Sequence, residues 1–267
     1  MADHREAVAA KLLRAIQRAG LEGSRYLPES FEIEVEGGGR LNLENAAAEY
    51  ERAGFLRRGA VLRRWVAFAR EAASGTIPKS IDEARANIIP IVRNQAFFAN
   101  LDLQIADGGI RPSPPVQPLA ADLTVSLAYD GKLAIAGLNA SDLDAWGISV
   151  DEAMKIARYN IRMRTPDGLR EISPGLHVSP YRDNHDGSRV VLTEVISRLS
   201  VQGDPVAFVP HRDVLIVTGT DDRDNLVKAA EMAMEALDDP RIISGRAICF
   251  QAGGWRPFMA TSDSPAH

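Results

Sequence analysis

Cysteine is nearly absent from this sequence, because Cys249 is the single one among 267 residues. One thiol cannot form an intramolecular disulfide, and chains without disulfides are typical of reducing compartments, so we expect a cytoplasmic protein. Cys249 lies within an apolar run, and free cysteines are among the most frequently buried residues. This argues against a thiol nucleophile.

Long apolar runs are also absent. No segment approaches the ~20 consecutive apolar residues that a membrane-spanning helix requires. The first twenty residues mix charges into a helical pattern, without the apolar segment that follows the basic start of a signal peptide. We therefore expect neither a membrane span nor a signal peptide.

The chain has no excess of positive charge. It carries 31 lysines and arginines against 36 aspartates and glutamates, a formal net charge of −5. Affinity for nucleic acid comes from a basic face, so we do not expect a nucleic-acid partner. A hydrophobic share of 45% and a charged share of 25% are typical of a globular protein with a sizeable core.

Complete catalytic and cofactor motifs are missing. His211-Arg212-Asp213 has the letters of the protein-kinase catalytic loop, but Thr218 stands where a kinase has asparagine, and no D-F-G motif follows. No H-E-x-x-H or C-x-x-C spacing of zinc ligands is present. We expect no cofactor, and whether the protein is an enzyme stays open.

The patterns that are present favour an α+β fold: a mostly antiparallel or mixed sheet flanked by helices. Short turns join many of the expected strands, and parallel neighbours would need longer crossovers. Residues 1–105 predict an N-terminal α-β-β-α-α subdomain, and the Pro/Gly-rich segment 106–120 predicts a linker or extended loop. We expect a C-terminal α+β domain over 121–260 and a frayed tail over 261–267.

Several elements of the C-terminal half follow from local signals. Alternating or apolar runs predict strands at 123–129, 168–178, 190–195 and 244–251. The pattern Ser141-Asp-Leu-Asp144 and the pattern Ser149-Val-Asp-Glu152 predict helix starts by capping, and 221–237 predicts a further helix.

The segment from Pro205 to Gly219 predicts a buried antiparallel hairpin, in which two apolar runs flank one charged turn. A turn explains His211, Arg212 and Asp213 structurally, since proline before them fixes the backbone and aspartate bonds neighbouring amides. The functional interpretation is that these three residues bind an anionic or polar ligand or a partner. Trp255 is a further candidate contact, because the preceding glycines allow close approach of a ligand.

A second cluster of polar residues follows the strand expected before residue 179. His177, Asp183, His185 and His211 could together form a metal site of imidazole and carboxylate ligands. No recognised metal-ligand spacing is present, and a solvated loop at 179–188 accounts for the same residues more simply.

Several segments, in colinear order over most of the chain, carry a family resemblance. They are Tyr26–Ile33, Leu41–Asn45, Ile89–Arg93, Asp122–Tyr129, Asp142–Gly147, Ala153–Asn160 and Val209–Leu215. In these the chain resembles the YtpQ-like bacterial family of unknown function, although the segments near 112–118 and 179–187 diverge. The resemblance implies an intracellular α+β protein and supplies no catalytic residues, but it marks the Arg212-Asp213 turn as a family feature.

Two functional hypotheses follow. The first is a non-enzymatic binding or adaptor protein that recognises a protein partner or a small polar ligand. The second is a hydrolase or transferase that uses the cluster of histidines and aspartates, with or without a divalent metal. Neither the ligand nor the partner is identified by the sequence, and a homo-oligomer stays open.

Overall fold

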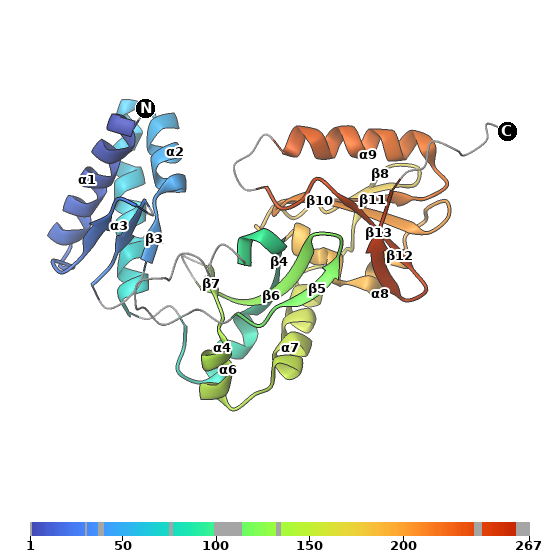
Figure 1. Cartoon of the computed structure of the whole chain (residues 1–267), viewed down its shortest axis with the longest axis horizontal. Helices are drawn as coiled ribbons and strands as arrows, with labels where there is room; N and C mark the ends of the chain where they lie inside the picture. The colour runs from blue at the N-terminus through green and yellow to red at the C-terminus, as the bar shows by residue number, and fades with distance from the viewer. Residues whose placement is uncertain are drawn as a thin grey trace. The chain divides into compact units, whose positions relative to one another are not determined.

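The chain divides into two compact units, which are described separately. The first comprises 1–84 with 129–136, and the second comprises 85–128 with 137–267 (Figure 1). The computed structural model describes residues 2–29, 31–36, 40–74, 77–98, 114–131, 135–237 and 242–259. Residues 106–113 of the expected linker and the expected tail, 261–267, lie outside the described residues. The described end of the linker, 114–120, contains a strand.

The first unit packs helices against a small antiparallel sheet with the order β1-β2-β3. The elements are α1 (Ala2–Arg18), β1 (Arg25–Leu27), β2 (Glu32–Glu34), β3 (Arg40–Asn42), α2 (Glu44–Arg52), η1 (Phe55–Arg57), α3 (Arg58–Ser74) and α4 (Ile81–Ala84). Leu12 and Ile16 on α1 pack with Ile33 and Trp65 in one buried core. The expected α-β-β-α-α arrangement is confirmed, with β1 as an additional strand.

The remaining elements form the second unit, apart from the end of β6 and most of β7. They are η2 (Arg85–Asn87), β4 (Ile88–Asn94), β5 (Gln117–Ala120), β6 (Leu123–Asp130), β7 (Ile135–Gly137), α6 (Ala140–Trp146), α7 (Val150–Met163), β8 (Arg170–Ser173), β9 (Leu176–Val178), η3 (Gly187–Val191), α8 (Thr193–Ile196), β10 (Pro205–His211), β11 (Val214–Gly219), α9 (Arg223–Ala236), β12 (Ala247–Gln251) and β13 (Gly254–Pro257). The larger sheet has the strand order β13-β12-β10-β11-β9-β8, and a smaller one has the order β4-β6-β5 with β7 beside β6. The α+β fold is therefore confirmed.

The expected hairpin forms the centre of the larger sheet. Strands β10 and β11 pair antiparallel, with Phe208 opposite Ile216 and His211 opposite Val214. Helix α9 covers one face, where Val206 and Phe208 meet its buried alanines (Figure 1). The other face packs against η3. Burial on both faces explains why the two strands are almost continuously apolar.

The prediction of a strand at 190–195 is wrong, since this stretch belongs to η3 and α8. The amides of Ser188 and Arg189 donate to the carbonyls of His185 and Asp186, which starts a helical turn just before the apolar run. The valines are buried there, but a short apolar run indicates burial without fixing the backbone conformation.

Two further expectations need correction. Asn139, not Ser141, caps α6, and its amide donates to the Asp142 carboxylate at 2.7 Å. The single strand expected over 168–178 is a hairpin of β8 and β9, because Gly175 turns the chain with a φ of 77°. The Ser149 cap of α7 is confirmed, since its hydroxyl accepts from the Glu152 amide at 3.2 Å. Within the described residues, no helix is both long and apolar enough to cross a membrane.

Candidate functional site

The β10–β11 turn gathers the three predicted residues into one polar cluster. His211 is buried, and Arg212 and Asp213 are half-buried. The Asp213 amide donates to His211 Nδ1 at 3.1 Å, so this nitrogen acts as an acceptor and carries no proton in this arrangement. One carboxylate oxygen of Asp213 lies 3.8 Å from Arg212 Nε and 3.8 Å from His211 Nδ1. The charge of the Asp213 carboxylate therefore restrains Arg212.

The loop 179–188 packs directly against this turn. The Gly187 amide donates to the Arg212 carbonyl at 2.9 Å. A Cβ atom on Gly187 would lie 2.9 Å from the His211 carbonyl oxygen and 3.0 Å from a methyl of Val209. The absence of a side chain at this position is thus what allows the loop and the turn to approach so closely.

The same loop also holds the end of strand β4. The Val92 amide donates to the Ser188 hydroxyl at 3.2 Å, and both residues are buried. Gly187 and Ser188 therefore connect the turn to β4 through two consecutive positions. This places Arg93, the residue after Val92, in the electrostatic neighbourhood of Arg212 and Asp213.

Arg93 is the residue of this site that the patterns did not single out. Burial, and then the positive charge of Arg212, lower the pKa of Arg93 to about 10, while the charge of Asp213 opposes the shift. The charges of Arg212 and Asp213 thus both act on Arg93. Partly desolvated guanidinium groups can hold an anion through charge-assisted hydrogen bonds.

Beneath the loop lies Arg189, whose side chain is completely buried. Its two terminal nitrogens donate to the two carboxylate oxygens of Asp183 at 2.8 and 2.7 Å. Nε donates to the Thr165 hydroxyl at 2.9 Å and Nη2 to the Arg164 carbonyl at 3.1 Å. The guanidinium also stacks 4.1 Å from the centre of the Tyr181 ring. Arg189 therefore connects the loop 179–188 to the residues that follow α7.

Asp183 and Asp186 respond to this environment in opposite ways. Burial alone would raise the pKa of Asp183, but the hydrogen bonds and charge of Arg189, with the His185 amide, lower it overall. Burial raises the pKa of Asp186, although Ser179 and the Tyr181 amide both donate to its Oδ1. The other oxygen, Oδ2, is buried and has no hydrogen-bond partner among the described residues.

The candidate metal residues are engaged separately. His177 Nε2 lies 3.2 Å from the Ser200 carbonyl, Asp183 binds Arg189, and His211 accepts the Asp213 amide. No three histidine, cysteine, aspartate or glutamate side chains in the described parts of the chain are grouped so that they could hold a metal ion. The prediction of a solvated loop at 179–188 is wrong as well, because His185, Asp186 and Ser188 are buried.

Trp255 is not brought to the turn. Trp255 on β13 pairs with Phe250 on β12, and the residue before Phe250, Cys249, pairs with Val206 on β10. Trp255 therefore lies near the Pro205 end of β10. The turn follows His211 at the other end of this strand, about 20 Å away at ~3.3 Å per residue. The Trp255 ring instead packs 5.3 Å from the Phe250 ring.

Comparison of the chain with protein-family models, curated proteins and solved structures yields no match.

Proposed function

We propose that this is a non-enzymatic binding protein, and that Arg93 and Arg212 together hold an anionic group. The group is a carboxylate or phosphate on a small polar ligand or on the surface of a protein partner. We include in this proposal a cytoplasmic location and membership of the YtpQ-like family, which rests on the colinear segments described above.

The observation that carries the proposal is the connection made by the loop. The hydrogen bonds of Gly187 to the turn and of Ser188 to β4 hold together the segments that carry the two arginines, and the charge of Arg212 acts on Arg93. A site of this kind loses little conformational entropy on binding, because its backbone is already fixed. The strong effect of burial on Arg93 is consistent with a position where an anion would offset unfavourable charge.

Asp213 has a positioning role in this proposal. Its carboxylate lies 3.8 Å from Arg212 Nε, which restrains the guanidinium. Arg93 and Arg212 then supply the positive charge of the site. Such a site selects anions over neutral polar compounds.

The test is a titration of the full chain with sodium phosphate and with sodium acetate, followed by NMR of the arginine Nε–H groups. We expect the Arg93 and Arg212 signals to shift with saturation. Arg93→Gln and Arg212→Gln should each weaken binding by roughly tenfold, the loss of one charge-assisted contact. Arg198→Gln, which removes an exposed arginine of the same unit, is the matched control.

Two results would refute the proposal. One is that the signals of Arg93 and Arg212 do not move at saturating anion. The other is that Arg198→Gln weakens binding as much as Arg212→Gln, which would indicate general charge attraction rather than a site.

A further inference from the structure

The first unit contains a separate hollow on its surface, between α1 and α3. Its volume is about 310 Å³, and Lys11, Arg14, Ala15, Arg18 and Leu62 line it. We call these five residues the basic groove. The hollow is open to solvent, so a ligand would lie against it rather than be enclosed.

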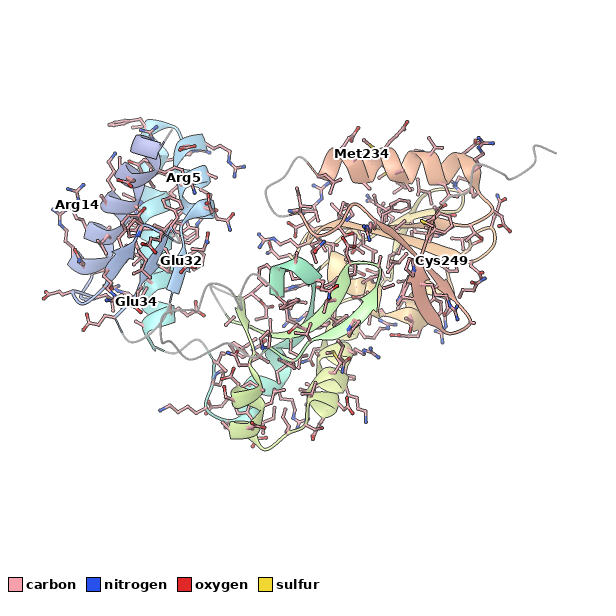
Figure 2. The ribbon with its side chains drawn as sticks, in the orientation of Figure 1. Arg5, Arg14, Glu32, Glu34, Met234 and Cys249 are labelled. Atoms are coloured by element: carbon pink, nitrogen blue, oxygen red, sulfur yellow. The ribbon has the colours of Figure 1, made fainter. Side chains whose placement is uncertain are left out.

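The two helices run side by side in the same direction along this groove. Near its start, Lys11 of α1 and Arg58 of α3 both stack on Tyr50, at 5.3 and 5.0 Å from the ring centre. Near its end, Arg70 of α3 donates to the Ala19 carbonyl at 2.9 Å. These contacts hold α1 and α3 side by side, and Figure 2 shows Arg14 on the outer side of α1.

The cations of the groove share one face of α1. Lys11, Arg14 and Arg18 are spaced i, i+3 and i+7, and all three are exposed. Within the described part of the chain, none of them forms an ion pair with a carboxylate, whereas Arg5, Arg25 and Arg64 of the same unit each do. The groove thus presents three exposed cations on one helix face, and no carboxylate of the described residues is paired with them.

We infer that the basic groove binds a small organic polyphosphate, that is, phosphate groups attached to an apolar body. From Lys11 to Arg18 the helix rises about 10 Å, at 1.5 Å per residue, which is more than one phosphate group spans. A chain of phosphates can contact all three cations. The half-buried Ala15 and Leu62 offer an apolar surface on which the body of the ligand would lie.

The experiment uses isothermal titration calorimetry on the full chain with magnesium-free ATP as the probe. Sodium tripolyphosphate tests the phosphates alone, and adenosine tests the apolar body alone. We expect ATP to bind more tightly than tripolyphosphate, and adenosine to bind at least tenfold more weakly than ATP. The affinity for ATP should fall as sodium chloride is raised, because the cations are exposed.

Variants then locate the site. The triple change Lys11→Gln, Arg14→Gln and Arg18→Gln should weaken ATP binding at least tenfold, and glutamine keeps the helix intact because its helix propensity is close to theirs. The control triple is Arg52→Gln, Arg57→Gln and Arg63→Gln, which removes exposed cations of the same unit outside the groove. It should bind ATP as the unchanged chain does.

The groove triple is also measured in an Arg93→Gln, Arg212→Gln background, which removes any ATP binding by the anion site proposed in the second unit, so that the ATP binding that remains and is then lost in the triple belongs to the basic groove. Absence of ATP binding, equal losses in the two triple variants, or adenosine binding as tight as that of ATP would each overturn the inference. Circular dichroism at 222 nm on every variant confirms that a loss of binding is not a loss of folding.

Discussion

The Gly187 amide donates a hydrogen bond of 2.9 Å to the carbonyl of Arg212, so a loop and a turn separated by 24 intervening residues are joined backbone to backbone. Two segments that the sequence marks separately as polar clusters are therefore parts of one structure. The contact leaves no room for a side chain on Gly187, since a Cβ would meet the His211 carbonyl oxygen at 2.9 Å.

Gly187→Ala tests this contact. The added methyl must displace the turn or the loop, and we expect a loss of about 1–3 kcal/mol in the free energy of unfolding, as for other overpacked sites. We also expect weaker anion binding, because Arg212 moves with its carbonyl. Urea denaturation measures the first effect and phosphate titration the second.

The control for that prediction is Gly254→Ala. A Cβ at Gly254 meets no atom within 4 Å, and its φ is not positive. Its stability should therefore change by no more than about 0.5 kcal/mol. If Gly187→Ala were equally mild, the close approach of loop and turn would have no energetic importance.

The hairpin and its turn could be predicted from the sequence because the signals are local. Two apolar runs with a short charged break define antiparallel neighbours, and burial on both faces removes the need for alternation. The cap of α7 at Ser149 is equally local, since it depends on residues three apart. Such features need no knowledge of distant contacts.

Arg93 and Arg189 could not be assigned in this way. Arg93 becomes part of the site only because Ser188, 96 residues after Val92, accepts a hydrogen bond from β4. Arg189 directly precedes the apolar run 190–195 that predicts a strand, and its complete burial depends on Asp183, Thr165 and the Arg164 carbonyl. A buried charge is stable only with such partners, and the sequence does not display them.

Asp183→Asn should destabilise the protein by leaving the buried guanidinium of Arg189 without its bidentate carboxylate. Removing one partner of a fully buried pair costs about 3–5 kcal/mol, and we expect about 2–3 kcal/mol here because the Asp183 side chain is 34% exposed. Urea denaturation at pH 7 measures the change. Asp144→Asn, which alters an exposed carboxylate on α6, should be nearly neutral, and equal losses in both variants would contradict the importance of the pair.

Zinc and manganese should not stabilise the protein. His177 Nε2 lies 3.2 Å from the Ser200 carbonyl, Asp183 is bound by Arg189, and His211 Nδ1 already accepts an amide hydrogen, so three of the four candidate ligands are engaged elsewhere. A metal bound only to the folded state at 100 times its Kd would add about 2.7 kcal/mol of stability. Thermal unfolding with each metal, and with EDTA as the reference, would reveal such a gain. A stabilisation that His185→Ala abolishes would restore the metal-dependent hydrolase or transferase hypothesis.

Asp186→Asn is expected to change how stability depends on pH. Burial raises the pKa of Asp186 above its ordinary value of 3.8, so ionisation is less favourable in the folded chain than in the unfolded one. The stabilisation linked to its proton is complete below that ordinary value and is lost as the pH rises through the folded-state pKa. Asparagine cannot ionise, and its carbonyl oxygen can accept the same hydrogen bonds from Ser179 and the Tyr181 amide.

The stability of Asp186→Asn relative to the unchanged protein should therefore improve between pH 4 and pH 7. Asp183→Asn should show the opposite trend, because the lowered pKa of Asp183 contributes stability above its ordinary value that is lost as the pH falls. Urea denaturation of the three proteins at pH 4, 5.5 and 7 measures both slopes. Slopes of the same sign would mean that the buried arginine does not distinguish the two carboxylates, since its bidentate contact with Asp183 is what separates them.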